Sequence, residues 1–104
     1  MQKYIIDISR QAERDFTNII KYIKNELLEP AIATKYSKLI KEKIDSLEYS
    51  PERFGIIDNE LIKNKEHRKL VIKNYIAFYR IDNEKNIVHI IRVFHGSRDW
   101  QNML

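Results

Sequence analysis

The chain has 104 residues and no cysteine, so a single domain spanning residues 1–104, without disulfides or thiolate chemistry, is the simplest expectation. Its composition is 43% hydrophobic and 33% charged with two glycines and two prolines, which excludes collagen-like and extensively disordered chains. The net charge is +4, and the whole excess lies in residues 60–104, which favours phosphate or an acidic protein as partner but equally fits a merely soluble basic protein.

The first half of the chain predicts one strand and two helices. A short apolar strand, residues 3–9, ends at a serine that can cap a helix. Apolar residues then recur at intervals of three and four over 12–27 and again over 33–47. Pro30 fits the first turn of the second helix, where its missing N–H costs nothing, and Ser50-Pro51 ends that helix. These stretches predict a helical hairpin.

The second half predicts a sheet. Residues 51–55 form a turn, 56–62 a weak connector or edge strand, and 63–66 a polar loop. Residues 68–100 are rich in β-branched and aromatic side chains and are interrupted at Lys73-Asn74 and 82–86, which predicts three consecutive antiparallel strands. We therefore expect an α+β fold, in which an N-terminal strand and a two-helix hairpin precede an antiparallel meander forming one sheet, with a short C-terminal helix.

Strict alternation along the last strand predicts which side chains share a face. One face would carry Val88, Ile90, Arg92 and Phe94, and the other Ile87, His89, Ile91, Val93 and His95. Both sets contain apolar residues, which is typical of a central strand covered on both sides. Tyr75 and Tyr79 would share a face of the preceding strand, either packed under a helix or exposed for stacking on bases.

Most catalytic motifs are missing from the sequence. It contains no glycine-rich phosphate loop, no His-Glu-x-x-His and no nucleophile elbow, and we expect neither a cofactor nor a metal. Zinc is disfavoured because His89 and His95 would lie about 20 Å apart along a strand. Metal-free RNA cleavage remains possible, with His95 as acid or base and Lys69, Arg92 and Arg98 holding phosphate.

A simpler interpretation assigns the same residues to structure. His95 and Arg98 would be polar residues at the end of a strand. Asp99 would pair with Arg98 or cap the short C-terminal helix, and Trp100 would cover the core.

Three segments of the second half carry a family resemblance. They are Arg68-Lys69-Leu70-Val71, residues 74–82 (Asn-Tyr-Ile-Ala-Phe-Tyr-Arg-Ile-Asp) and residues 91–99 (Ile-Arg-Val-Phe-His-Gly-Ser-Arg-Asp). With the preceding strand and helical hairpin, they make the chain resemble the RelE/ParE superfamily of toxins from type II toxin-antitoxin modules.

The resemblance implies one of two activities. RelE-like members cut messenger RNA on the ribosome without metal, whereas ParE-like members poison DNA gyrase. The RelE-like pattern would have an arginine where this chain has Ile76, and its tyrosine near the C-terminus has no clear counterpart here. Lys69 does match a lysine of the RelE-like basic strand, and Arg98 falls near a C-terminal arginine of that branch. The segments 78–82 and 95–99, however, look closer to the ParE-like branch.

We therefore expect a gyrase-binding toxin, with a ribosome-dependent mRNA endoribonuclease as the alternative and an inactive or purely regulatory member as a third possibility. The expected target-binding residues are Arg68, Lys69, Arg92, His95 and Arg98, on a sheet face left open by the helices. If the protein is a ribonuclease, the expected catalytic residues are Lys69, His95 and Arg98.

Expected partners and location complete the hypothesis. The resemblance implies a cognate antitoxin whose C-terminal segment wraps the toxin, and contact with operator DNA only through that antitoxin. The sequence has no run of 18 apolar residues and no secretory signal, so we expect a cytoplasmic protein without a membrane partner.

Overall fold

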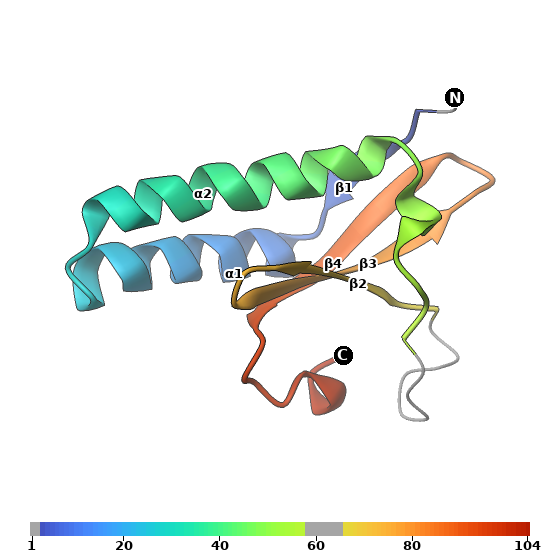
Figure 1. Cartoon of the computed structure of the whole chain (residues 1–104). Coiled ribbons are helices and arrows are strands. Elements are labelled where there is room, and N and C mark those ends of the chain that lie inside the picture. The colour runs from blue at the N-terminus through green and yellow to red at the C-terminus, as the bar shows by residue number, and fades with distance from the viewer. Residues whose placement is uncertain (1–2, 58–65) are drawn as a thin grey trace.

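The computed structural model describes residues 3–57 and 66–104. In chain order the strands and helices are β1 (Ile5–Ile8), α1 (Arg10–Lys21), α2 (Pro30–Asp45), β2 (Arg68–Ile72), β3 (Tyr75–Asp82) and β4 (Ile87–His95). The two helices lie side by side over one face of the sheet, and the C-terminal tail lies below the other face (Figure 1). The predicted α+β order is confirmed, whereas residues 58–65, in the expected connector and polar loop, lie outside the described part.

Ser9 begins α1 as predicted. Its hydroxyl oxygen accepts a hydrogen bond from the Ala12 N–H at 2.9 Å, and its own hydroxyl hydrogen is donated to the Ile91 carbonyl at 2.8 Å. One side chain therefore caps the helix and ties its start to β4. Helix α1 continues into a π-helical turn over Tyr22–Glu26, and α2 then begins at Pro30.

The sheet has the order β1-β4-β3-β2. Strand β1 pairs in parallel with β4, while β4 with β3 and β3 with β2 pair antiparallel, so the first and last strands are neighbours. Tyr79 and Ala77 of β3 are fully buried beneath the helices, and Tyr75 of the same strand packs on Ile23 and Ala33. The packing interpretation of the two tyrosines is thus confirmed.

A β-bulge in β4 overturns the predicted alternation. Phe78 pairs with Arg92 but Tyr79 pairs with Ile90, so Ile91 is an extra residue without a partner on β3. The bulge reverses the faces beyond it. As a result Val88, Ile90 and Val93 pack toward the helices, whereas Arg92 and Phe94 lie on the opposite face with His89.

The tail makes a second, smaller core on the face away from the helices. Ile57, Ile76, Phe78 and Phe94 are buried there, with Trp100, Met103 and Leu104 packed against them. Trp100 covers this core, as the structural interpretation of the sequence had it. The predicted C-terminal helix amounts to one three-residue 3₁₀ turn, Trp100–Asn102. Among the described residues, no helix has the length and hydropathy needed to cross a bilayer.

Candidate target-binding surface

An aromatic stack with cations at both ends occupies the face away from the helices. The Trp100 and Phe78 ring centroids lie 5.1 Å apart, and those of Phe78 and Phe94 lie 5.8 Å apart. The Lys69 ammonium lies 5.7 Å from the Trp100 ring, while the guanidinium carbons of Arg92 and Arg98 lie 4.4 and 5.4 Å from the Phe94 ring. Cation–π attraction therefore helps to hold all three cations beside this stack.

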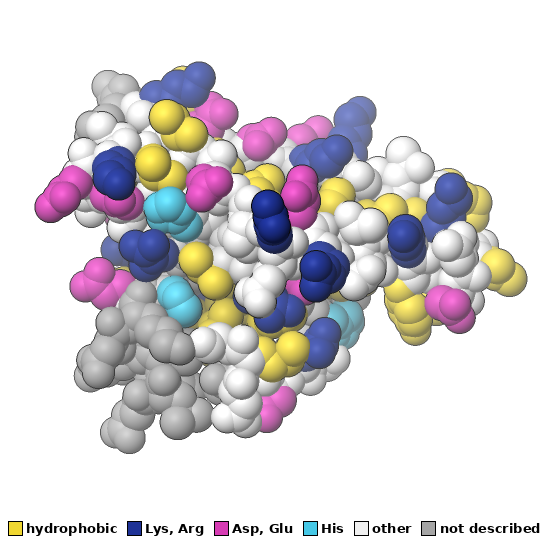
Figure 2. All heavy atoms as spheres, turned by 180° about the vertical axis from the view of Figure 1, so that it is seen from behind, with side chains coloured by type: hydrophobic (Ala, Val, Ile, Leu, Met, Phe, Trp, Pro, Cys, Tyr) yellow, Lys and Arg dark blue, Asp and Glu magenta, His cyan; other side chains and the backbone are white. Residues whose placement is uncertain are grey.

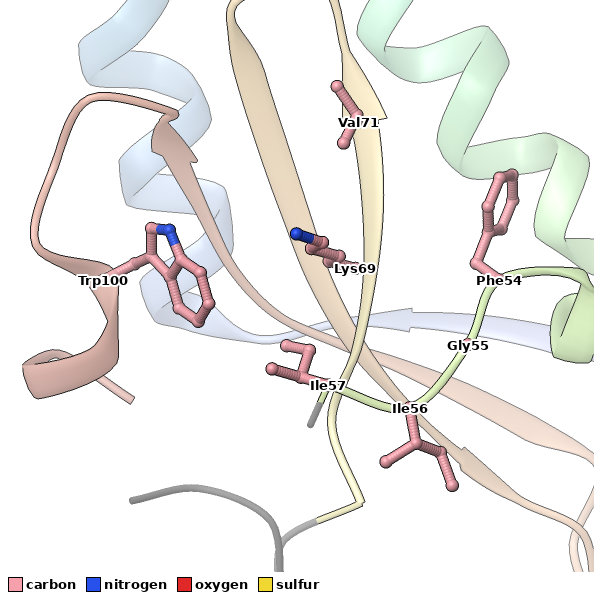
Figure 3. A pocket seen from close by; sticks show the side chains of 7 residues that line it. All are labelled: Phe54, Gly55, Ile56, Ile57, Lys69, Val71 and Trp100. Carbon is pink, nitrogen blue, oxygen red and sulfur yellow. The ribbon is translucent and has the colours of Figure 1, made fainter. Parts of the chain in front are cut away.

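Lys69 projects into a groove at the β2 end of the stack. The groove has a volume of about 550 Å³ and runs between Trp100 and the chain segment that carries Phe54 (Figure 3). The described residues that line it, apart from Lys69, are apolar or contribute backbone: Phe54, Gly55, Ile56, Ile57, Val71 and Trp100. Of the described carboxylates, none lies within ion-pair distance of Lys69. Lys69 is thus a cation available to an incoming ligand.

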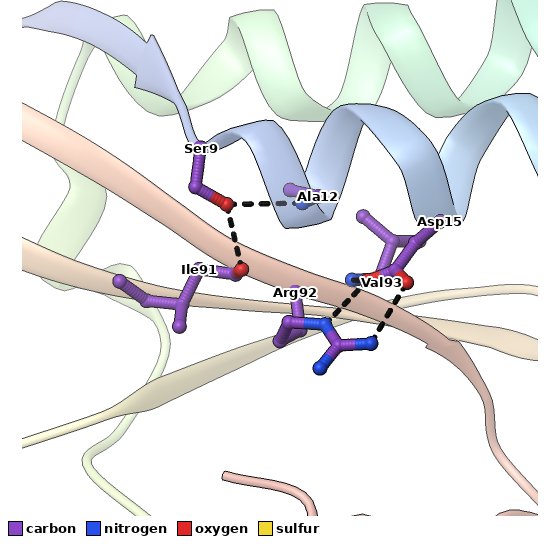
Figure 4. A network of polar contacts seen from close by, with 6 residues as sticks. All are labelled: Ser9, Ala12, Asp15, Ile91, Arg92 and Val93. Atoms are coloured by element: carbon purple, nitrogen blue, oxygen red, sulfur yellow. Dashed lines mark hydrogen bonds and ion pairs between the residues drawn. The ribbon is translucent and has the colours of Figure 1, made fainter.

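Arg92 is engaged within the molecule. Its Nε and Nη2 donate to the two carboxylate oxygens of Asp15 at 2.7 and 2.9 Å, and the Val93 N–H donates to the same carboxylate at 3.0 Å (Figure 4). The side chains of Arg92 and Asp15 are 19% and 12% exposed. The hydrogen bonds to Asp15 raise the pKa of Arg92 above its usual value, against the smaller opposing effect of burial. The pair ties α1 to β4.

Arg68 is also engaged within the molecule, on the helix side of β2. Its Nη1 donates to the carbonyl oxygens of Phe54 and Glu52 at 2.5 and 3.3 Å. The neighbouring Tyr79 hydroxyl donates to the Pro51 carbonyl at 2.5 Å. Arg68 and Tyr79 together hold the segment after α2 against the sheet.

His95 lies on the helix side of the sheet, at the end of β4. Its ring meets Tyr75 edge to face with centroids 5.3 Å apart, and its Nδ1 lies 2.7 Å from the Ser97 hydroxyl oxygen. Because the Ser97 backbone N–H donates to Nδ1 at 3.1 Å, a neutral imidazole carries its proton on Nε2. Arg98 lines the same groove as His95 and reaches around the strand end to Phe94.

The five expected target-binding residues are therefore divided between two faces. Lys69 lies on the face away from the helices, His95 lies on the helix side, and exposed Arg98 lies between them at the strand end. Arg68 and Arg92 make internal contacts. On the face seen in Figure 2, Lys and Arg side chains are spread out, with Asp and Glu side chains among them.

Sequence reasoning missed Asp15 and the aromatic stack as parts of this surface. Asp15 belongs to a mixed-charge helix face, and nothing in the local pattern distinguishes it from a solvated residue. The strand spacing of Phe78 and Phe94 does indicate burial, but their contact depends on the bulge. Within residues 3–57 and 66–104, no three His, Asp or Glu side chains gather where they could hold a metal ion.

Several solved structures have the same fold as this chain. A chain of the chromosomal ParDE toxin-antitoxin system of Pseudomonas aeruginosa superposes with a TM-score of 0.73 at 19% identity, covering 89% of this chain and 96% of that one. The toxin-antitoxin complex RelBE2 of Mycobacterium tuberculosis gives 0.64 at 25% identity, covering 91% and 93%. A mutant of Escherichia coli toxin RelE in the free state gives 0.68 at 15%, covering 98% and 93%.

The family follows from the sequence match. The family model described as the ParE toxin of the type II toxin-antitoxin system, parDE, matches residues 6–100. No curated protein matches the chain. The protein belongs to the ParE toxin family and is the toxin component of a type II toxin-antitoxin system.

Proposed function

We propose that this toxin inhibits DNA gyrase by binding to it, with no nuclease activity of its own, and that it acts in the cytoplasm. The observation that carries the proposal is the separation of Lys69 from His95. Lys69 lies on the face away from the helices over Trp100, while His95 lies on the helix side against Tyr75. Membership of the ParE toxin family supports the same target.

Metal-free RNA cleavage requires an acid, a base and a cation around one phosphate. A general acid or base must come within about 3 Å of the proton that it transfers. Side chains on opposite faces of a sheet cannot both reach one phosphodiester in this way. Arg98 can approach either side from the strand end, but its guanidinium stays protonated at neutral pH and so serves neither as general acid nor as general base.

The position of Ile76 also favours binding over cleavage. The resemblance to RelE-like nucleases implies an arginine there. In this chain the isoleucine is 9% exposed in the core formed with Phe78 and Phe94, where the tail covers it. A phosphate could not approach this position without displacing the tail.

A cognate antitoxin is the second proposed partner. The P. aeruginosa and M. tuberculosis relatives are described as a toxin-antitoxin system and a toxin-antitoxin complex. We propose that this chain is neutralised in the same manner, and that it meets operator DNA only through the antitoxin. The presence of Lys69 and Arg98 beside one aromatic stack keeps the ribosome-dependent endoribonuclease as the alternative.

Two assays on the antitoxin-free protein distinguish these functions. One measures DNA supercoiling by purified gyrase, and the other measures cleavage of ribosome-bound message. We expect loss of supercoiling and accumulation of cleaved DNA while message stays intact. Message cleavage with normal supercoiling would overturn the proposal, and so would a toxin inactive in both assays.

Substitution of His95 adds a mechanistic control. An essential acid or base contributes about 10² to 10⁴-fold to a rate. His95→Gln keeps a polar side chain without a titratable ring, so we expect gyrase inhibition to change by less than about tenfold, the effect of a lost hydrogen bond. His89→Gln serves as the matched control, since His89 pairs with Asp7 away from the groove that contains His95.

A further inference from the structure

Strand β2 forms one edge of the sheet, and its outer backbone groups determine what can pair with it. Lys73 and Asn74 make a two-residue turn, so the closing pair Ile72–Tyr75 exchanges both ladder hydrogen bonds. Alternation then directs the N–H and C=O groups of Lys69 and Val71 away from β3. The bond from the Ile57 N–H to the outward carbonyl of His67, at 2.8 Å, agrees with this assignment.

The edge is covered at its beginning and open further along. The bridge between Ile56 and Arg68 covers the first residue of β2, after which the segment carrying Phe54 diverges from the strand (Figure 3). Val71 is 57% exposed and Ile56 48% exposed, and both line the groove that contains Lys69. Within residues 3–57 and 66–104, no backbone group bonds to the outward N–H and C=O of Val71, and exposed apolar side chains adjoin them. This combination recruits an extended segment.

The charge of the groove specifies the kind of segment. Among the described residues, the groove is lined by one cation, Lys69, and by no carboxylate. Lys69 and Val71 lie two residues apart and point to the same face. On a strand added to β2, the side chains that lie next to them must also be two residues apart, because neighbouring side chains alternate between faces.

We propose that the open edge of β2 docks an extended segment of a partner protein in which an acidic residue and an apolar residue are separated by one residue. The carboxylate pairs with Lys69. The apolar side chain lies against Val71 and fills the groove beside Trp100. The segment's backbone bonds to the outward groups of Val71, as in other cases of strand addition.

A peptide fits this groove better than single-stranded RNA does. Base recognition uses exposed aromatic faces, yet Phe78 and Phe94 are 0% and 1% exposed, and Trp100 is already in contact with Phe78 and Lys69. The free backbone donors and acceptors of an edge strand match another backbone. This inference stands whichever enzyme the toxin inhibits, so it does not depend on gyrase being the target.

Labelled peptides of about seven residues, an ordinary strand length, test the inference on the full-length protein. The first carries Glu-Thr-Ile in a Thr-rich background. The second has the order Glu-Ile-Thr, which places the same two side chains on opposite faces. We expect the first to bind on the order of tenfold tighter in fluorescence anisotropy. Equal binding, or binding of neither peptide, would overturn the proposal.

Two changes separate the charge from the backbone contribution. Lys69→Glu should reverse the preference, so that a Lys-Thr-Ile peptide binds better than the Glu-Thr-Ile one, while Arg80→Glu on the same sheet face should leave the preference unchanged. N-methylation of the backbone amides of the first peptide should weaken its binding to the wild-type protein. An unaltered preference in Lys69→Glu would contradict the docking site.

Other occupants of the edge have distinct signatures. Displacement of the peptide by an oligouridylate would show that the groove binds RNA and would overturn the proposal. Sedimentation showing that a second copy of the chain occupies the edge, with the peptide dissociating the dimer, would overturn it as well.

Discussion

Ile76 shows how one side chain limits what the face away from the helices can do. It is 9% exposed, and Val71 lies directly opposite on β2 with 57% of its surface exposed. We predict that Ile76→Arg lowers the free energy of unfolding by about 3 kcal/mol, because it buries a charge and displaces the tail. Val71→Arg is the matched control and should change stability by less than about 1 kcal/mol.

Urea denaturation followed by circular dichroism measures both variants. An Ile76→Arg protein that is as stable as the wild type would show that the tail opens without cost. If that variant also gained RNA cleavage, the binding-only function would be contradicted.

Titration of Tyr79 makes the stability of the fold decrease at high pH. Burial raises its pKa to about 12, while the unfolded chain titrates near 10. Below pH 10 the Tyr79 hydroxyl keeps its proton in both the folded and the unfolded state, so its contribution to the free energy of unfolding is fully present. As pH rises from 10 to 12 the unfolded state loses the proton first, so we predict that stability falls by on the order of 2 to 3 kcal/mol.

The Tyr79→Phe variant isolates this effect from lysine titration. It removes the hydrogen bond to the Pro51 carbonyl and should cost about 1 to 2 kcal/mol at neutral pH. The difference between wild type and variant should then shrink above pH 10 in urea denaturation curves. Parallel pH profiles would show that Tyr79 does not titrate with folding.

Residue roles were predictable from sequence only where they are local. Ser9 as helix cap and Pro30 as helix start depend on neighbouring residues, and both are found as predicted. The bond between Asp15 and Arg92 joins residues 77 positions apart, and no local pattern encodes it. For this reason the sequence did not indicate that Arg92, an expected target-binding residue, ties α1 to β4.

At the scale of elements, two acidic residues join different elements to β4. Asp15 joins α1 to Arg92 with 12% of its side chain exposed, whereas Asp7 of β1 bonds to His89 at 2.9 Å with 60% exposed. We predict that Asp15→Asn costs about 2 kcal/mol, because it leaves a half-buried guanidinium without its counter-charge. Asp7→Asn should cost less than about 0.5 kcal/mol, since water screens an exposed pair.

Thermal unfolding of the two asparagine variants provides the comparison. Each substitution keeps the shape of the side chain and removes one charge. The difference between the two losses of stability therefore reflects how deeply each ion pair is buried. Equal losses in the two proteins would contradict the scaffold role of Asp15.

The elements themselves were predictable and their register was not. Hydrophobic periodicity located both helices, and the interruptions at 73–74 and 82–86 located all three meander strands. The extra residue Ile91 is of a type common in strands, so the sequence did not predict the bulge. Because the bulge determines where Arg92 and Phe94 point, the sequence did not predict their place in the candidate site either.

At the scale of the whole molecule, the sheet separates two cores of unequal size. The core beneath the helices includes Tyr79, Ile40 and Leu47, all without exposed surface. The core beneath the tail is closed by Trp100 and the last two residues. We predict that Trp100→Ala destabilises the protein by about 3 kcal/mol, since it removes an aromatic ring from a stack and leaves a cavity.

Hydrogen exchange locates that loss. Amides near the tail core, at Ile57 and Gly96, should exchange faster in Trp100→Ala, while those of α2 beside Ile40 should keep most of their protection. Uniformly faster exchange would mean that the two cores open together. Leu104→Ala, at the edge of the same core, should have a smaller effect.

The bulge at Ile91 makes β4 more tolerant of a one-residue loss at this point than a regular strand would be. Exchanging one aliphatic residue for another there alters volume by a methyl group or two. Losing the codon for Ile91 would remove the bulge, and strict alternation from Ile90 would still direct Arg92 away from the helices and Val93 beneath them. Losing one residue from the regularly paired stretch 76–78 of β3 would instead reverse the faces of the residues beyond it, so functional variants of this toxin should differ in residue count at the bulge before they do so there.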